Sequence, residues 1–175
     1  MITIRQARIE DAPGIAKVHV DSWRTTYAGI VPDDYLANLS YQRRTNLWDD
    51  ILRDAERKSI VYVAENEQQE IVGFVGGGPD REENPPYEAE LYTIYILQAY
   101  QGQGIGRRLV RVFAEQLLRA GMKSMLLWVF AQNPSRHFYE ALGGRYVKSA
   151  QFEIGGATLE EEAYGWEDVS VLVQD

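Results

Sequence analysis

The chain has 175 residues, of which 45% are hydrophobic and 25% are charged, and 26 acidic against 18 basic side chains give it a net charge of −8. This length and apolar share predict a single globular domain over residues 1–175, and the acidic balance argues against a general nucleic-acid binder, which needs a basic face. No apolar run approaches the roughly 20 residues of a membrane span, and the start MITIRQARIEDA has no signal-peptide pattern, so we expect a cytoplasmic protein without a membrane partner.

The N-terminal part of the chain is predicted to form one strand and two helices. Residues 2–7 have the pattern of a short strand, and Asp11 is a candidate N-cap of a helix with a proline near its start. A second helix is expected after Ser40, running toward Leu52, because apolar residues recur there at helical spacing. The stretch between the two helices, 23–41, is rich in aromatic residues.

The central part is predicted to form three strands. Residues 60–65 and 71–76 are rich in apolar and β-branched residues and flank a polar segment, which is typical of a hairpin. Glycines end the second of these strands, and an acidic loop follows it to Glu88. Residues 91–96 form the next predicted strand.

Glycines mark the boundaries of the next two elements. The turn 102–106 leads into an amphipathic helix, and Gly121 is a natural residue to end it. Residues 125–130 are almost continuously apolar, as expected for a strand in the middle of a sheet.

The last part of the chain predicts a short helix and two strands. Asn133, followed by a proline, is expected to cap a helix that continues through Leu142. Two strands follow, one around Phe152 and one over 164–173. The order of elements predicts a mixed α/β fold.

The sharpest feature is the sequence QGQGIGRR at residues 101–108, between a predicted strand and a helix. Glycines let the backbone approach a bulky ligand, and the free N–H groups of a helix N-terminus suit a pyrophosphate. Arg107 and Arg108 oppose the helix dipole there, which suggests that an anion binds nearby. A Walker loop needs a Gly-Lys pair, which the chain lacks, and a dinucleotide fingerprint needs a third glycine in place of Arg107. Two interpretations of this segment remain: a coenzyme A site and a tight turn without a ligand.

Three segments together resemble the GNAT N-acetyltransferase superfamily. The pattern Q-x-x-G-x-G over 101–106 resembles its acetyl-CoA signature, and ELYTIYI over 90–96 resembles its fourth strand. Asn133 with FYEALG over 138–143 resembles its later Asn…Phe-Tyr motif. The resemblance covers essentially the whole chain. It implies the α/β acyl-CoA N-acyltransferase fold, a mixed, mostly antiparallel sheet of about seven strands flanked by about four helices.

The resemblance also implies that acetyl-CoA is the co-substrate. Its pyrophosphate would lie on the glycine-rich turn, formed by Gln101, Gly102, Gln103, Gly104, Ile105, Gly106 and Arg107. Main-chain groups of Ile94 and Ile96 would bond the pantetheine arm, because its amides can pair like an added strand. Asn133 is expected to cap its helix and to be a further coenzyme contact.

Acetyl transfer to an amine needs a proton acceptor for the nucleophile and a proton for the departing thiolate. The resemblance makes Tyr139 the candidate acid for the thiolate and Glu90 the candidate base, acting directly or through a water. Strand alternation places Glu90, Tyr92, Ile94 and Ile96 on one face. The competing interpretations are a packed tyrosine and a solvated glutamate.

Composition limits the other chemistry. Because the chain has no cysteine, disulfides, zinc ribbons, iron–sulfur clusters and a cysteine acyl-enzyme are excluded, which favours direct transfer in a ternary complex. The two histidines, His19 and His137, are too far apart for a metal motif, so no metal site is predicted. We expect His19 to be a packed or surface histidine and assign no role to His137. Most aromatic rings of 23–41 are expected in the core, with one or two at the acceptor pocket.

The resulting hypothesis is an N-acetyltransferase that transfers the acetyl group of acetyl-CoA to a primary amine of a small molecule or peptide. The alternatives are an acyl-CoA-binding sensor without catalysis and an acetyltransferase of peptide or protein N-termini. The resemblance also allows a homodimer.

Charge is unevenly distributed along the chain. Residues 101–119 carry four arginines against one glutamate, whereas residues 78–90 and 153–168 are strongly acidic. An acidic acceptor mouth would attract a positively charged amine. A solvated acidic surface is the alternative.

Overall fold

A computed structural model describes residues 1–82 and 85–174. Its strands form one sheet of seven strands in the order β1-β2-β3-β4-β5-β7-β6. The strands are β1 (Thr3–Gln6), β2 (Ile60–Glu65), β3 (Ile71–Pro79), β4 (Ala89–Ile96), β5 (Met125–Phe130), β6 (Arg145–Ile154) and β7 (Ala157–Trp166). Neighbouring strands pair antiparallel except β4 and β5, which run parallel. The predicted mixed, mostly antiparallel sheet is confirmed.

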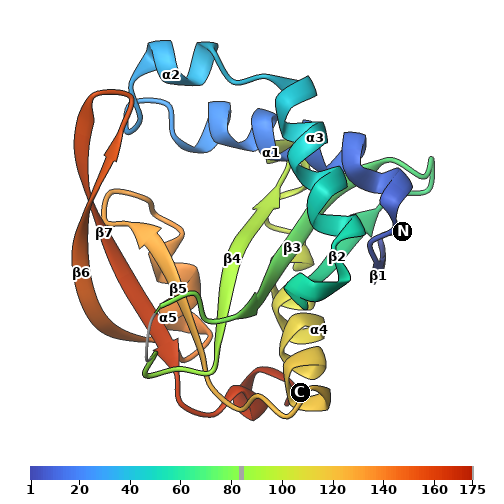
Figure 1. The fold of residues 1–175 in the computed structure, drawn as a ribbon, viewed down its shortest axis with the longest axis vertical. Helices are drawn as coiled ribbons and strands as arrows, with labels where there is room; N and C mark the ends of the chain where they lie inside the picture. The colour runs from blue at the N-terminus through green and yellow to red at the C-terminus, as the bar shows by residue number, and fades with distance from the viewer. Residues whose placement is uncertain (83–84, 175) are drawn as a thin grey trace.

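The described residues form five α-helices, placed on both faces of the sheet (Figure 1). They are α1 (Ala12–Thr26), α2 (Asp33–Ala37), α3 (Tyr41–Arg53), α4 (Ile105–Arg119) and α5 (Arg136–Ala141). The buried side chains of α1 and α3 share one core cluster with Phe74 of β3, whereas those of α4 form a second cluster with β4, β5 and β7. None of the described helices is long and apolar enough to cross a membrane.

Helix ends follow the predicted capping residues in part. The Ser40 hydroxyl accepts a backbone N–H of the first turn of α3 at 3.1 Å, and Gly121, with φ +83°, follows the end of α4. Both predictions are confirmed. Asp11 precedes α1 as expected, but its carboxylate does not cap that helix. It instead accepts the N–H of Arg8 at 2.7 Å and pairs with the Arg5 guanidinium, which joins β1 to the start of α1.

One helix was not predicted, and one predicted strand boundary is wrong. The aromatic stretch 23–41 contains a short helix, α2, which its sequence does not signal because the stretch has no long apolar stripe. The glycines 76–78 do not end β3, because Gly77 and Gly78 pair with β4 and the strand continues to Pro79. Pairing with a neighbouring strand overrides the low strand propensity of glycine.

Two boundaries near the C-terminus also differ from prediction. The short helix begins at Arg136 because the Asn133 amide oxygen accepts the N–H of Ser135 at 2.9 Å and so stabilises a turn before the helix. The last strand is β7, over Ala157–Trp166, whereas residues 169–172 form a 3-10 turn.

Candidate active site

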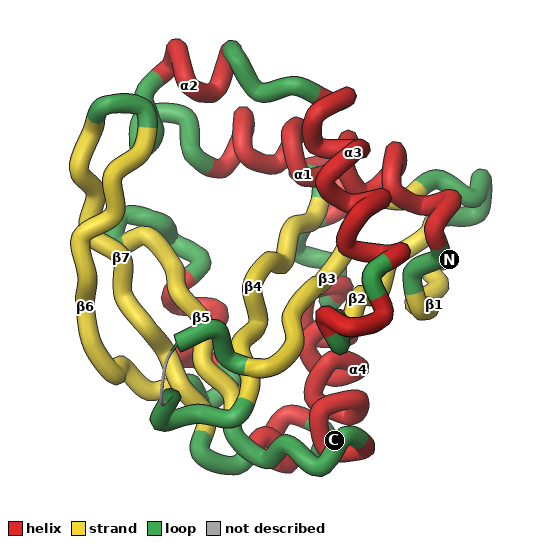
Figure 2. The backbone as a smooth tube through the Cα atoms, viewed as in Figure 1, coloured by secondary structure: helices red, strands yellow, loops and turns green. Residues whose placement is uncertain are grey.

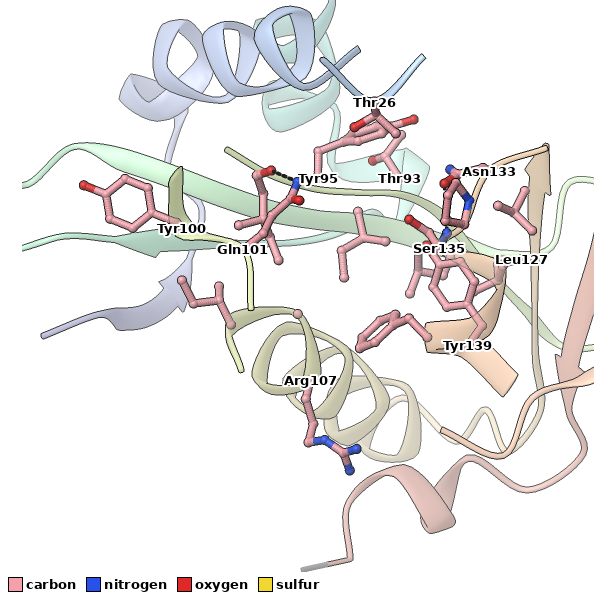
Figure 3. Close-up of a pocket in the computed structure, with 18 of the residues that line it drawn as sticks. Thr26, Thr93, Tyr95, Tyr100, Gln101, Arg107, Leu127, Asn133, Ser135 and Tyr139 are labelled. Atoms are coloured by element: carbon pink, nitrogen blue, oxygen red, sulfur yellow. Dashed lines mark hydrogen bonds between the residues drawn. The ribbon is translucent and has the colours of Figure 1, made fainter. Parts of the chain in front are cut away.

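The candidate site is a cavity of about 540 Å³ between β4, β5, the start of α4 and α5 (Figure 3). Its walls include most of the site residues predicted from the sequence. These are Ile94, Ile96, Gln101, Gly102, Gly104, Ile105, Gly106, Arg107, Asn133 and Tyr139. Gln103 lies instead on a neighbouring hollow with Arg108, and Glu90 is not part of the cavity wall.

The cavity opens because β4 and β5 separate. The two strands pair only over 89–91 and 125–127, and Figure 2 shows their tubes close at these ends and diverging beyond them. On its other edge β4 stays paired with β3 as far as Ile96, and the next N–H, of Leu97, donates to Val72 at 2.9 Å.

This pairing sets the direction of the main chain in β4. Antiparallel strands direct alternate residues' N–H and C=O groups to one neighbour, so those of Ile94 and Ile96 face the gap toward β5. The Gln101 side-chain amide donates to the Ile96 carbonyl at 3.0 Å, from the side of the glycine-rich turn. The main-chain groups of Ile94 and the N–H of Ile96 therefore face a ligand that lies in the cavity, whereas the Ile96 carbonyl already accepts from Gln101.

A β-bulge interrupts β4 beside the cavity. Gly76 of β3 pairs with Thr93 and Gly77 pairs with Leu91, which leaves Tyr92 as the extra residue. A Cβ added to Gly76 would lie 3.2 Å from both Thr93 and Trp48 of α3, so the Thr93 side chain points toward the α3 face.

Because of the bulge, the side chains of β4 do not share faces as predicted. Ile94 and Ile96 pack against the core cluster of α4, whereas Tyr95 packs against the cluster shared by α1 and α3 and against a third cluster that includes a residue of α2. Glu90 and Tyr92 share one partner, Arg81, but do not share a face with Ile94 and Ile96 as strict alternation predicted. The extra residue shifts the alternation by one position.

The glycine-rich turn has the backbone that its sequence predicted. Gly102 and Gly104 have φ of +74° and +78°, and a Cβ added at either position would meet no atom within 4 Å. Gly106 is needed for packing instead, since its Cβ would lie 3.2 Å from Phe138 and 3.3 Å from Ile96. The first turn of α4 therefore lies close to β4 and α5, with open space before it.

The two arginines of this turn differ in their surroundings. The Arg108 guanidinium donates to the Ile2 carbonyl at 3.0 Å, which ties it to the N-terminus. Arg107 borders the cavity, and Figure 3 shows its guanidinium on the outer side of α4, directed away from Tyr95 and Asn133.

Tyr139 enters the cavity from α5 and is 7% exposed. Burial raises the pKa of its phenol well above the ordinary value, and the nearby Tyr95 adds to the rise. The group therefore keeps its proton throughout the physiological pH range and can donate a hydrogen bond to a ligand atom.

Two further tyrosines, which the sequence did not single out as a pair, line the same cavity. Tyr27 follows α1 and Tyr95 belongs to β4, and their hydroxyl oxygens are 3.0 Å apart. Burial raises the pKa of Tyr27 well above its ordinary value, with further contributions from Tyr95 and Tyr139, while the Asn133 amide acts in the opposite direction. Burial likewise raises the pKa of Tyr95. Because the two tyrosines are 68 positions apart, no local sequence pattern predicts their contact.

Glu90 is held apart from the cavity by an ion pair. Its side chain is 5% exposed, and both carboxylate oxygens accept from Arg81, at 2.7 and 3.0 Å. The Arg81 guanidinium also lies 4.1 Å from the centre of the Tyr92 ring. Because Tyr92 lines the cavity, Arg81 links Glu90 to a residue of the cavity wall.

The two acidic segments predicted from the sequence meet near Glu90. Burial raises the pKa of Glu161 in β7, and the charge of Glu90 adds to the rise. Burial also raises the pKa of Asp80, with added contributions from the charges of Glu90 and Glu82. Lys148 pairs with Glu82 at 3.0 Å. Residue 83, also in the first segment, lies outside the described residues.

Of the packed and surface positions expected for His19, the structure shows the packed one. It is 5% exposed, its Nδ1 accepts the indole N–H of Trp48 at 3.1 Å, and its ring stacks on Tyr95 with centroids 5.2 Å apart. Burial lowers the pKa of His19 to about 3, and the positive charge of Arg44 contributes, so the imidazole is neutral at physiological pH. Within 1–82 and 85–174, no three His, Asp or Glu side chains are placed to hold a metal ion.

Comparison with known proteins identifies the family. The sequence profile of the acetyltransferase (GNAT) family matches residues 19–144. The chain is 46% identical to an uncharacterised N-acetyltransferase, YuaI, of Bacillus subtilis, over 98% of this chain and 96% of that protein. It is 25% identical to a spermidine N(1)-acetyltransferase of Thermoplasma acidophilum, over 75% of this chain and 80% of that one.

A solved structure shows the same fold. The PaiA N-acetyltransferase of Thermoplasma acidophilum in complex with coenzyme A superposes with a TM-score of 0.68 at 23% identity, over 94% of this chain and 99% of that one. The family profile covers well over half of the chain, and the Bacillus relative matches nearly all of it. The chain therefore belongs to the acetyltransferase (GNAT) family of acetyl-CoA-dependent N-acetyltransferases.

Proposed function

We propose that this protein transfers the acetyl group of acetyl-CoA to a primary amine of a small molecule or peptide, by direct attack within a ternary complex on one domain of residues 1–175. The observation that carries the proposal is the gap between β4 and β5, which runs from the glycine-rich turn to Tyr139. The gap joins a place suited to phosphates with a buried proton donor.

The residues along the gap fit coenzyme A. The N–H groups of residues 101–107 would hold the pyrophosphate, where Gly102 and Gly104 leave the approach open. The main-chain groups of Ile94 and Ile96 would pair with the pantetheine amides, and Asn133 would contact the same arm. The coenzyme supplies an acetyl thioester, which an amine can attack.

The chain's own groups supply the proton chemistry. Tyr139, protonated because burial raises its pKa, would donate a hydrogen bond to the departing sulfur. Because the chain contains no cysteine, a cysteine-linked acetyl intermediate is excluded. This supports direct attack by the amine.

Glu90 would accept the proton of the amine through water rather than by direct contact. Its carboxylate is buried, bound by Arg81 and outside the cavity wall, so a water in the cavity would have to carry the proton to it. An amine of pKa near 10 is mostly charged at neutral pH, so an acceptor is required.

Glu90→Gln is expected to lower kcat at neutral pH by at least about tenfold. The loss should shrink as the pH approaches the pKa of the amine, because the substrate then arrives deprotonated. A pH profile of kcat measures this. Arg81→Gln is the matched control, since it breaks the same ion pair but leaves the carboxylate. Equal losses with the same profile in both variants would show that the ion pair is structural only.

The acceptor is proposed to be positively charged, such as a polyamine. The charges of Glu90 and Glu82 act on Asp80, and the charge of Glu90 acts on Glu161. Arg81, paired with Glu90, and Lys148, paired with Glu82, neutralise only part of this negative charge. A negative potential there would attract a cationic amine. The spermidine acetyltransferase among the relatives agrees with this charge.

An amine panel with release of free thiol as the readout tests the proposal. Turnover should be highest for polyamines, lower for neutral monoamines, and should fall with salt because charged surfaces are screened. Coenzyme binding without turnover of any amine would favour the sensor. Activity on peptide N-termini alone would favour the peptide or protein acetyltransferase.

A further inference from the structure

The Tyr27–Tyr95 pair has a fixed position in the cavity. The Tyr95 ring stacks on His19 at 5.2 Å and contacts Phe74 at 5.9 Å, between ring centroids. The Tyr27 ring meets the edges of Trp23 and Phe130, at 4.7 and 5.3 Å. Packing on all these sides holds the two hydroxyls in one arrangement, as a preorganised binding group requires.

The pair keeps hydrogen-bonding capacity for a ligand. Both pKa values are raised by burial, so both phenols are uncharged at physiological pH. The two hydroxyl oxygens are 3.0 Å apart and share one hydrogen bond, and Asn133 and Trp23 interact with Tyr27 and Tyr95 respectively. One O–H and one lone pair are left for a ligand. A neutral oxygen can accept an N–H of an amine without removing the proton, and thereby orient the nitrogen lone pair.

The bulge at Tyr92 determines which substrate the pair can meet. It directs Tyr95 to the α1 face of β4, while the main chain and side chains of Ile94 and Ile96 border the proposed coenzyme path. Tyr139 contributes to the raised pKa of Tyr27, and Tyr95 to that of Tyr139, and all three tyrosines line the same cavity.

We propose that the Tyr95 hydroxyl binds the acceptor amine and orients its lone pair toward the thioester, and that Tyr27 is a positioning residue that acts through Tyr95. The inference rests on the proposed acetyl transfer. It gives a role to two residues for which the resemblance implied none. No bond is made to either tyrosine. The pair acts by hydrogen bonding alone.

The test measures three quantities in phenylalanine variants: the KM and kcat for a polyamine, the Kd of that polyamine for the enzyme with coenzyme A, and the Kd of acetyl-CoA. Tyr95→Phe should raise the acceptor KM and Kd about three- to tenfold, the effect of one hydrogen bond. The Kd of acetyl-CoA should not change. Tyr27→Phe should change the same two parameters by less, and the double variant should match Tyr95→Phe, because the hydroxyls act as one unit.

Tyr164→Phe is the matched control, since its hydroxyl is also packed near the sheet but donates to Glu162 at 2.8 Å and does not line the cavity. Thermal unfolding of each variant separates misfolding from lost binding. An unchanged acceptor KM and Kd in Tyr95→Phe overturns the inference, as do additive effects of the two substitutions or a loss of acetyl-CoA affinity. If the unaltered protein acetylates no amine, the proposed function itself fails, which is a different result.

Discussion

Tyr139→Phe is expected to lower kcat by at least about tenfold while acetyl-CoA affinity stays nearly unchanged. The phenol would act on the sulfur only as the thioester breaks, so its removal should affect turnover rather than coenzyme binding. Because burial raises the pKa of Tyr139, the protonated form persists as the pH rises, and kcat in the unaltered enzyme should not fall through loss of this acid below about pH 10.

Steady-state thiol release and calorimetric binding of acetyl-CoA measure the two parts of this prediction. Tyr164→Phe again serves as the control, because it removes a hydroxyl outside the cavity. A Tyr139→Phe enzyme with full turnover would remove Tyr139 as the acid. A large loss of coenzyme affinity would assign the residue to binding instead.

Gly104→Val is expected to abolish coenzyme binding. Gly104 has φ +78°, and its missing side chain leaves open space in front of the first turn of α4. A valine would place methyl groups where the pyrophosphate approaches, and the left-handed backbone would cost about 1–2 kcal/mol for a residue with a Cβ.

Gly121→Val separates these two effects. Gly121 has φ +83°, also faces open space, and lies at the other end of the same helix. Both variants should therefore lose similar thermal stability, whereas only Gly104→Val should lose acetyl-CoA binding. Normal binding by Gly104→Val would contradict the proposed phosphate site, and equal loss in both would show that strain in α4 is the cause.

Local signals predicted much of the fold and the backbone of the glycine-rich turn that borders the cavity. The glycine-rich turn needs positive φ at Gly102 and Gly104, and only glycine adopts it freely, so the sequence reveals the turn directly. The strand 125–130 is apolar on both faces and was located to the residue. Such features depend on neighbours in sequence.

The features that sequence reasoning missed depend on contacts between distant segments. At the bulge, β4 has one more residue than the segment of β3 that it pairs with. The alternation of apolar and polar residues along β4 alone cannot reveal this. The Tyr27–Tyr95 contact and the Arg81–Glu90 ion pair join side chains whose spacing has no period. The candidate base was therefore found by its position in a motif, but its guanidinium partner was not.

The short pairing between β4 and β5 links ligand binding to folding. Only three residues of each strand pair. Beyond them, the chain itself does not supply the hydrogen bonds that would join the two halves of the sheet. An extended molecule with amide groups can supply them from outside. By mass action, a ligand at a hundred times its Kd adds about 2.7 kcal/mol to the free energy of unfolding. The sheet would thus resist heat and proteases more strongly when its proposed coenzyme is abundant, by an amount that grows with the logarithm of the coenzyme concentration.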